Sequence, residues 1–427
     1  MSAGTDNRPR RFRELPGKVW RPIHYLGSKL RLTGLICSLL DELADGPVCD
    51  LFAGSGTVSM ALSGSRDVLA ADIQEYSRVI CTAILKPAPI FDQDVTDLLK
   101  RAERSRSKLE GCLEPLLEHE QQAIERSDAQ PELLCNLVEH GSLISVGASG
   151  ALAKAIKATK SRLERAGTAL TATRYFGGRY FSFRQAVFID SILNESKGEV
   201  YLAALLSTAS EIVNSIGKQF AQPMRPRRKD GTIKTHLIRQ MCRDRCRDAG
   251  DVFSGWLFRY RSIAQDRAHR VMRGDYREVL TQQKDFAVIY ADPPYTRDHY
   301  SRFYHVLETL CLQDCPDIST TFLTGPTSRG LYRADRHQSP FCIKSKAPGA
   351  FAELFAGAKG VPMLLSYSPF VKDGHPRMMT IDAVAELARH HYSKVKIVSA
   401  SLAHSKLNKK DLHRDASDQA EVFLFCR

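Results

Sequence analysis

The chain has 427 residues, of which 43% are hydrophobic and 26% charged, a composition typical of a folded globular protein rather than a disordered or fibrous one. Lys and Arg outnumber Asp and Glu by 61 to 48, and the net charge of +13 favours a polyanionic partner such as nucleic acid. No apolar run approaches the ~20 residues of a membrane helix, and 11 scattered cysteines fit reduced thiols in a cytosolic protein better than a disulfide framework.

The predicted elements begin after a basic arm, residues 1–20, which lacks the apolar core of a secretory signal. Residues 32–43 repeat Leu and Ile at helical spacing, and "PVCDLFAGSGT" then reads as a short buried strand that ends in a glycine turn. A helix, a second strand "DVLAAD" and another helix follow. This alternation is typical of a parallel α/β sheet, so residues 21–91 are predicted to form half of a doubly wound domain.

The alternation stops between residues 92 and 250, where charged and apolar segments both have helical periodicity. We interpret this region as an inserted, mainly helical lobe. Apolar runs return in residues 251–427, at "FAVIYADPPY", "VPMLLSYS", "KVKIVSASL" and "EVFLFCR", and they predict the strands that complete the sheet. The polar loop at 324–340 is long enough to be mobile or to contact a ligand.

The glycine turn after the first strand has the features of a ligand-binding loop. Gly54 and Gly56 let the backbone approach a ligand next to the N-terminus of the following helix. Asp72 ends the next strand, where an acid in Rossmann-like folds hydrogen-bonds two ribose hydroxyls. The lysine of a phosphate-binding P-loop and the full dinucleotide fingerprint are absent, so neither ATP nor NAD is favoured. A tight turn and a helix-capping aspartate remain the alternatives.

The stretch "IYADPPYT" carries an acid out of a predicted buried strand and stiffens the backbone directly after it. The Asp292 carboxylate can accept one hydrogen of a planar amine and the Pro293 carbonyl the other, while Pro294 fixes the turn and Tyr295 offers a face for stacking. Two fixed acceptors draw a conjugated exocyclic amine toward tetrahedral geometry and offset the positive charge that develops on attack. A surface proline turn is the alternative.

The segments "HYLGSK", "DLFAGSGT", "AAD" and "ADPPYT" occur in the order found in a known family. The sequence resembles the AdoMet-dependent DNA adenine N6-methyltransferases of the Dam-like class α, or D12 class, and especially their type II restriction-modification members. The resemblance covers residues 21–90 and 270–310 well, and the remaining strands loosely. It implies a Rossmann-like methyltransferase sheet whose AdoMet-binding half is 21–91, target-recognition lobe 92–250 and catalytic half 251–427.

The resemblance also implies which residues bind the cofactor. They are Tyr25, Gly27, Lys29, Phe52, Gly54, Gly56, Asp72, Asp275 and Tyr276. The first three belong to a motif that closes over the methionine end of AdoMet, with Lys29 near its carboxylate, and Asp72 would bind the ribose. Asp275 would reach the adenine amino group of AdoMet. A solvated lysine beside a core tyrosine, and a simple turn aspartate, are the alternatives.

A further set of basic and aromatic residues is predicted to contact DNA. The set is Arg225, Arg227, Arg228, Lys229, Arg297, Tyr300, Arg302 and Tyr304. The basic run around Gly231 suits a loop or hairpin that enters a DNA groove. Tyr300 and Tyr304, one helical turn apart, suit a flipped base. A solvated charge run and a buried aromatic stripe are the alternatives.

Together these features predict an enzyme that flips an adenine out of double-stranded DNA and methylates its N6 from AdoMet. The catalytic residues would be Asp292, Pro293, Pro294 and Tyr295, no metal is required, and a restriction endonuclease or defence proteins would reside on other chains. RNA adenine or cytosine N4 could use the same two acceptors, and a non-catalytic DNA-binding subunit is the alternative of a different class. Two CxxxC pairs, at 242/246 and 311/315, leave a zinc site open.

Overall fold

The computed structural model describes residues 18–167, 170–319, 330–368, 377–399 and 421–427. The chain forms two compact units. The sheet unit comprises Met1–Lys86, Gln265–Tyr300 and His337–Arg427, and the helical unit comprises Pro87–Ala264 and Ser301–Arg336. Most of the predicted arm and residues 324–329 of the predicted polar loop lie outside the described residues. Within the described segments, no helix combines the length and the apolar character needed to cross a bilayer.

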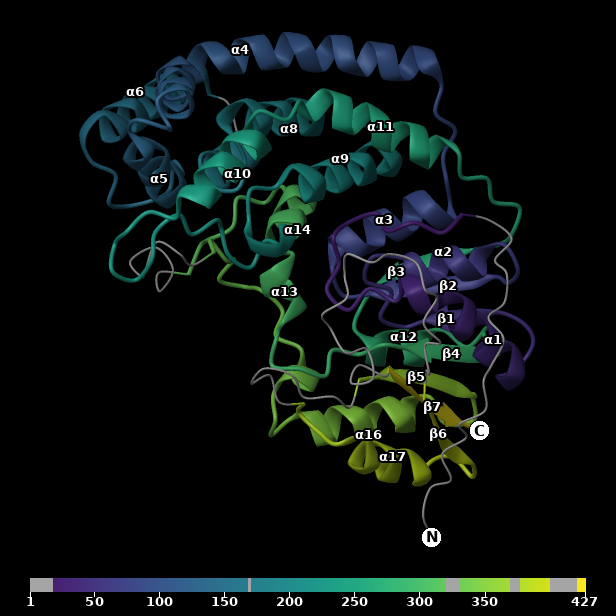
Figure 1. The fold of residues 1–427 in the computed structure, drawn as a ribbon. Coiled ribbons are helices and arrows are strands. Elements are labelled where there is room, and N and C mark those ends of the chain that lie inside the picture. Colours follow the sequence, from purple (N-terminus) through teal and green to yellow (C-terminus); the bar gives the residue numbers. More distant parts are fainter. Residues whose placement is uncertain (1–17, 168–169, 320–329, 369–376, 400–420) are drawn as a thin grey trace, which may run out of the picture. The chain divides into compact units, whose positions relative to one another are not determined.

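The sheet unit is built on a seven-stranded sheet with strand order β3-β2-β1-β4-β5-β7-β6 (Figure 1). The strands are β1 (Val48–Asp50), β2 (Val68–Asp72), β3 (Arg270–Arg273), β4 (Val288–Ala291), β5 (Met363–Tyr367), β6 (Val395–Ser399) and β7 (Val422–Cys426). All pairs among β1 to β5 are parallel, whereas β7 is antiparallel to both β5 and β6. Because β1 lies between β2 and β4, the carboxyl ends of β1 and β4 are neighbours at the point where the winding reverses.

Helices cover the sheet because most side chains of its central strands are apolar on both faces. Cys49, Leu51, Ile289 and Ala291 belong to one core that also includes side chains of the helices α12, α16 and α17. Helix α1 lies against β4 and β5, and helices α2 and α3 lie against β2. The helices of this unit are η1 (Leu30–Leu32), α1 (Thr33–Leu43), α2 (Thr57–Ser63), α3 (Glu75–Leu85), α12 (Tyr276–Gln282), η3 (Pro340–Cys342), α16 (Ala347–Gly357) and α17 (Ile381–Arg389).

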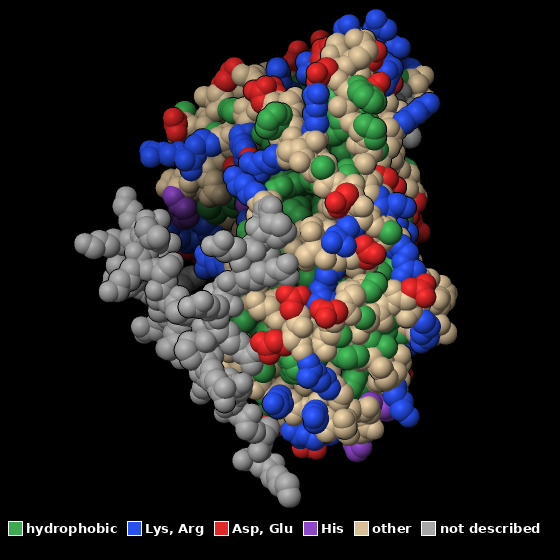
Figure 2. Space-filling model, turned by 90° about the vertical axis from the view of Figure 1, so that its right-hand side faces the viewer, with side chains coloured by type: hydrophobic (Ala, Val, Ile, Leu, Met, Phe, Trp, Pro, Cys, Tyr) green, Lys and Arg blue, Asp and Glu red, His purple; other side chains and the backbone are tan. Residues whose placement is uncertain are grey.

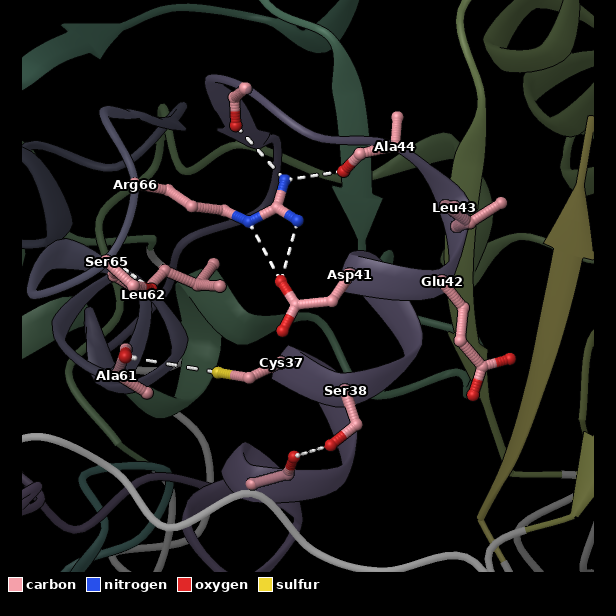
Figure 3. Close-up of polar contacts among 12 residues, drawn as sticks. Cys37, Ser38, Asp41, Glu42, Leu43, Ala44, Ala61, Leu62, Ser65 and Arg66 are labelled. Atoms are coloured by element: carbon pink, nitrogen blue, oxygen red, sulfur yellow. Dashed lines mark hydrogen bonds and ion pairs between the residues drawn. The ribbon is translucent and has the colours of Figure 1, made fainter.

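Arg66 ties the end of α1 to the segment that follows α2 (Figure 3). Its Nε and Nη2 atoms both donate to Asp41 Oδ1, at 3.2 and 2.7 Å, and its Nη1 atom donates to the Ala44 and Gly46 carbonyls, at 2.7 and 3.1 Å. Both carbonyls belong to the segment that joins α1 to β1. One buried guanidinium therefore satisfies two carbonyls of this connection and fixes the approach to β1.

Replacing Arg66 by Met should lower the free energy of unfolding by about 2 kcal/mol, because two carbonyls and one carboxylate lose charged donors. Asp41 is 37% exposed, which keeps the effect below that of a fully buried pair. A urea titration followed by far-UV circular dichroism would measure the change. Arg389, which pairs with Glu386 on the exposed face of α17, is the matched control, and Arg389→Met should cost less than about 0.5 kcal/mol. If both variants lost the same free energy of unfolding, Arg66 would not stabilise the connection between α1 and β1.

The helical unit has its own core. The 34-residue helix α4 places Leu109, Leu113, Leu116 and Ala123 on one stripe, and it packs against α6 and α8. Glu120 of α4 forms a buried ion pair with Arg245 and accepts from the Phe183 amide, so this buried carboxylate has two partners inside the unit. The helices are α4 (Asp92–Glu125), α5 (Pro131–His140), α6 (Gly150–Ala166), α7 (Ala172–Tyr175), α8 (Phe183–Glu195), α9 (Glu199–Ile212), η2 (Ile216–Lys218), α10 (Thr235–Arg245), α11 (Ala249–Arg261) and α14 (His305–Leu312).

The α/β fold with an inserted helical lobe is confirmed, and its boundaries differ from those that the sequence suggests. The sequence places residues 251–427 in the catalytic half, but helix α11 and residues 301–336 belong to the helical unit. The short helix α13 (Tyr300–Phe303) contains the point of division. Strand β3 has no counterpart among the predicted strands, since "RVMR" is neither apolar throughout nor regularly alternating.

Candidate active site

The glycine loop and the acid–proline motif meet at the switch point of the sheet. Strand β1 pairs with β4 in parallel, with Asp50 opposite Tyr290, so the residues that follow these strands leave the sheet at the same edge. Gly54 and Gly56 follow β1, and Asp292 follows β4 directly. Open α/β sheets bind their ligands at this edge. The structure thus brings together the two motifs that the sequence singled out separately.

The conformation of the loop after β1 depends on two glycines with left-handed backbone conformation and on one aspartate. Gly54 and Gly56 have φ angles of +53° and +71°, a region that residues with a Cβ rarely adopt. The Gly54 amide donates to Asp72 Oδ2 at 2.9 Å, and the Gln74 amide donates to Asp72 Oδ1 at 2.9 Å. Asp72 therefore connects the loop after β1 to the end of β2. Burial raises the pKa of Asp72, and these backbone donors oppose the increase.

The N-terminal motif lies over this loop. A Cβ placed on Gly54 would meet Tyr25 Oη at 2.4 Å, so the Tyr25 ring rests directly on the glycine backbone. The Tyr25 ring contacts the Tyr300 ring with a centroid distance of 5.3 Å, and Tyr300 Oη donates to the Leu26 carbonyl at 3.1 Å. Gly27, with φ of +71°, allows the turn beside Tyr300. Tyr300, predicted to contact DNA, here holds the N-terminal motif in place.

Lys29 makes contacts that the sequence did not predict. Its Nζ atom lies 2.9 Å from Asp292 Oδ2, 3.2 Å from Glu421 Oε1 and 3.2 Å from the Gly27 carbonyl. An ammonium has three hydrogens to donate, so these three acceptors account for all of them. The sequence places Lys29 near the carboxylate of AdoMet, whereas in the structure it is committed to the acid of the proline motif.

The charges in this cluster perturb one another. Burial raises the pKa of Asp292 to about 6, while the neighbouring Lys29 ammonium opposes the increase. Burial also lowers the pKa of Lys29, but Asp292, Tyr295 and Glu421 outweigh it and hold the pKa well above its usual value. Lys29 therefore remains charged throughout the neutral range. Asp292 is ionised at pH 7 and titrates close below it, as suits a group that interacts with a reacting amine.

Tyr295 forms a braced aromatic surface beside Asp292. Its ring lies 4.9 Å from the Tyr367 ring, and the guanidinium of Arg377 lies over it at 5.1 Å from the centroid. The Met378 amide donates to the Tyr295 carbonyl at 3.1 Å. Pro293 is buried and Pro294 is half-buried. The turn that the two prolines are expected to stiffen is thus supported by strand β5 and by the segment at 377–378.

Asp275 and Tyr276 lie at the carboxyl end of β3 and begin helix α12. The Asp275 side chain accepts from the Arg277 amide at 3.0 Å and pairs with the Arg277 side chain at 2.8 Å, so it caps the helix. The Tyr276 ring is buried between Phe52, at 5.9 Å, and Phe341, at 5.3 Å. This is the turn-aspartate arrangement that the sequence left open. Phe52 is half-buried and next to the glycine loop.

The basic run in the helical unit forms a hairpin. The Arg228 amide donates to the Thr232 carbonyl at 2.8 Å, the Lys234 amide donates to the Pro226 carbonyl at 2.8 Å, and Gly231 takes a φ of +85° at the turn. Arg228 and Lys229 at the tip are exposed. Figure 2 shows one face of the molecule, on which basic and acidic side chains are interspersed.

The other predicted DNA-contacting residues have varied surroundings. Arg227 pairs with Glu139 at 3.2 Å, Arg225 is half-buried, and Arg297 of the sheet unit is exposed. Arg302 Nε donates to Tyr332 Oη at 2.9 Å. Helix α13 ends at Phe303 and α14 begins at His305, so no continuous helix carries Tyr300 and Tyr304 one turn apart, contrary to the prediction. Tyr304 is 0% exposed, which fits the buried-aromatic alternative.

Two acids of the site escaped the sequence-based search. Asp50 ends β1, is 1% exposed and accepts from Ser59 Oγ at 2.6 Å, and burial raises its pKa to about 7. An acid inside the otherwise apolar run "PVCDLF" is the signal that could have identified it. Glu421 has no comparable signal, because it simply precedes a terminal apolar run. In the described parts of the chain no three His, Cys, Asp or Glu side chains gather as a metal site requires, so the CxxxC pairs do not form a shared zinc site there.

Comparisons with known proteins agree with the motifs. The model of the D12 class N6 adenine-specific DNA methyltransferase family matches residues 25–163 and 257–323. The chain is 36% identical over 102 residues to modification methylase LlaI of Lactococcus lactis subsp. lactis, a match that covers 24% of this chain and 14% of that protein. It is 37% identical over 81 residues to type II methyltransferase M.FokI of Planomicrobium okeanokoites, covering 19% of this chain and 11% of that protein.

These matches thus span well under two thirds of either relative. The family match nevertheless includes the N-terminal motif, the glycine loop, Asp72 and the acid–proline motif. The resemblance of this chain to the D12 class of N6 adenine-specific DNA methyltransferases is thereby confirmed.

Proposed function

We propose that this protein transfers a methyl group from AdoMet to N6 of an adenine flipped out of double-stranded DNA. The observation that carries the proposal is the position of Asp292, Pro293, Pro294 and Tyr295 at the switch point of the sheet, beside the loop of Gly54. The family match supports the reaction class.

The chain's own groups have the chemistry that this reaction needs. The Asp292 carboxylate accepts one hydrogen of the adenine amino group, the Pro293 carbonyl accepts the other, and the Tyr295 ring supports the base. As the nitrogen lone pair forms the new bond to carbon, the nitrogen becomes positive, and the nearby carboxylate stabilises that charge. The nitrogen then loses one of its protons through Asp292 to water.

The residues around the glycine loop fit AdoMet. Asp50 Oδ1 and Tyr290 Oη are buried and have no hydrogen-bond partner among the described residues, and AdoMet carries an ammonium and two ribose hydroxyls that could supply donors and acceptors. The Gly54 backbone, Phe52 and Asp72 would hold the nucleoside portion, and Tyr25 would cover it. When bound, AdoMet supplies a methyl group on a sulfonium, whose carbon–sulfur electron pair leaves with the sulfur.

The proposal is tested with isotopically labelled AdoMet and a panel of duplex DNAs, followed by nucleoside chromatography. We expect label in N6-methyladenine from the wild-type protein and none above background from Asp292→Asn. Label in N4-methylcytosine, or in RNA alone, would reassign the acceptor. Absence of transfer to every duplex, with DNA binding retained, would instead indicate a binding module.

The hairpin tip is proposed to contact the DNA backbone. Replacing Arg228 and Lys229 together by Gln should weaken duplex binding about tenfold at low salt and reduce the slope of log affinity against log salt by about 2, because two phosphate contacts are lost. Fluorescence anisotropy at several salt concentrations would measure both. The matched control replaces Lys157 and Lys160, two exposed lysines of α6, by Gln, and it should leave the slope unchanged. An equal change in the control would remove the hairpin from the interface.

The biological setting is proposed to be restriction-modification or phage defence, with a cognate endonuclease or defence protein on another chain. The names of the two relatives, a modification methylase and a type II methyltransferase, support this setting. Genome-wide mapping of N6-methyladenine in cells that express the chain would test it. Methylation confined to one short sequence motif is the expected result, and scattered methylation would contradict it.

A further inference from the structure

Three charged groups form an array at the candidate active site, with the cation in contact with both carboxylates. Lys29 Nζ lies between Asp292 Oδ2, at 2.9 Å, and Glu421 Oε1, at 3.2 Å. The side chains of Lys29, Asp292 and Glu421 are 6%, 19% and 15% exposed, so water screens their charges only in part. Glu421 belongs to none of the motifs that predict the site.

Glu421 is held in place by the antiparallel part of the sheet. It directly precedes β7, whose residue Val422 lies opposite Tyr367 of β5. Ser366 of β5, which is 0% exposed, donates from Oγ to Glu421 Oε1 at 2.7 Å. The same oxygen faces Lys29, so Ser366 and Lys29 both orient this carboxylate.

The array determines the net charge beside the amine nitrogen in the proposed reaction. Methyl transfer leaves a positive charge on the amine nitrogen, and Asp292 must stabilise it. Lys29 and Asp292 form an ion pair with no net charge. Such a pair stabilises a positive charge on the amine nitrogen less than a lone carboxylate would. A second carboxylate beside Lys29 returns the three groups to a net charge of minus one.

We propose that Glu421 is a positioning residue, which acts through Lys29 to fix the orientation of Asp292 and to restore the negative charge that the reacting amine needs. The inference rests on the proposed function. Its electrostatic consequences extend to the protonation of Asp292, which can be measured without methyl transfer.

The groups that face Asp292 come from several elements. Lys29 precedes η1, Glu421 precedes β7, Asp50 ends β1, and Tyr290 and Tyr295 flank Asp292 on its own segment. Arg377 lies over the Tyr295 ring. Lys29 opposes the effect of burial on the pKa of Asp292, and Glu421 adds to it. Removing the charge of Glu421 should therefore lower the pKa of Asp292.

The test compares wild type, Glu421→Gln and Glu421→Asp in steady-state methyl transfer across pH. The Gln side chain keeps the shape and an acceptor oxygen but removes the charge. We expect kcat of Glu421→Gln to fall about 10- to 100-fold, somewhat less than the loss of a direct oxyanion donor, with KM for AdoMet within about threefold. The acidic limb of its kcat/KM profile, which reports the free enzyme, should lie at lower pH than the wild-type limb near 6. Glu421→Asp should recover most of the rate.

A merely structural role would lower the rate without moving the acidic limb downward. Wild-type kcat and an unmoved limb in Glu421→Gln would overturn the inference, and so would a limb that moves to higher pH. An inactive wild-type protein would refute the proposed function, and the inference would then be decided by the pH dependence of stability.

That second measurement compares each protein with its Asp292→Asn counterpart in urea titrations. Because the folded-state pKa of Asp292 is raised, protonation of Asp292 stabilises the folded protein below pH about 4, and this contribution is lost as pH rises through about 6. In the Glu421→Gln background, the stability contributed by protonated Asp292 should be fully lost at a lower pH than in the wild-type background. Identical profiles in both backgrounds would overturn the inference.

Discussion

Asp292→Asn is expected to reduce the rate of methyl transfer by about 1000-fold or more, while the affinities for AdoMet and duplex DNA change by less than about threefold. The Asn side chain has nearly the shape of the carboxylate, so the β4 turn and its prolines should keep their geometry. What it lacks is the negative charge that opposes the charge on the methylated nitrogen, and a group that can take up the departing proton. Single-turnover transfer of a labelled methyl group to duplex DNA measures the effect.

The matched control is Asp285→Asn, which changes an acid that precedes the same strand β4. Asp285 is 86% exposed and pairs only with the surface residue Arg270 among the described ion pairs, so its replacement should leave the rate within about twofold. A rate for Asp292→Asn within tenfold of wild type would remove this carboxylate from the chemistry. A parallel loss of DNA affinity would instead assign it to binding.

Much of the sheet could be predicted because its central strands β1, β2, β4 and β5 are buried almost throughout. Runs such as "VLAAD" and "FAVIYAD" are almost entirely apolar up to an aspartate at their carboxyl end. The positions of Gly54 and Asp292 at one edge then follow from parallel pairing alone. Strand β3 and the antiparallel insertion of β7 between β5 and β6 could not be predicted, because they depend on which neighbours complete the sheet edge.

The contacts within the site were less predictable than its location. Lys29 and Glu421 lie near opposite ends of the chain, and nothing local in either segment indicates that both side chains meet Asp292. Tyr300 likewise contacts Tyr25 and Leu26 across most of the sequence. Periodicity reports which face of an element is buried, but it does not report which distant side chain a polar group pairs with. The motif residues were therefore located from sequence, while their partners required coordinates.

The hairpin at 225–234 could be predicted from its local residues, whereas the role of Tyr304 could not. Gly231 within a polar run is a local signal for a turn, and the turn is present. Tyr304 is aromatic and follows Tyr300 at an apparent helical spacing, but the helix is interrupted between them. An aromatic side chain satisfies a core and a stacking site equally well, so sequence alone left both open.

Gly54→Ala is expected to destabilise the protein by about 3 kcal/mol and to weaken AdoMet binding at least tenfold. Two effects combine at this position. An alanine at φ of +53° costs about 1 kcal/mol or more, and its Cβ would lie 2.4 Å from Tyr25 Oη and 2.6 Å from Tyr25 Cζ. The Tyr25 ring, which rests on the Tyr300 ring, would have to leave the loop that it covers. Urea titration and isothermal titration calorimetry with AdoMet measure the two losses.

Gly167→Ala separates the two effects, because Gly167 has a similar φ of +60° and nothing within 4 Å of an added Cβ. This control should show the backbone cost alone, about 1 kcal/mol, with unchanged AdoMet binding. Removing the ring with Tyr25→Ala should make Gly54→Ala less harmful to stability than it is in the wild-type background, although not to cofactor binding. If Gly54→Ala and Gly167→Ala cost the same and AdoMet binding persists, the Tyr25 ring does not rest on the glycine backbone in solution. The cofactor would then have to be placed elsewhere along the carboxyl edge of the sheet.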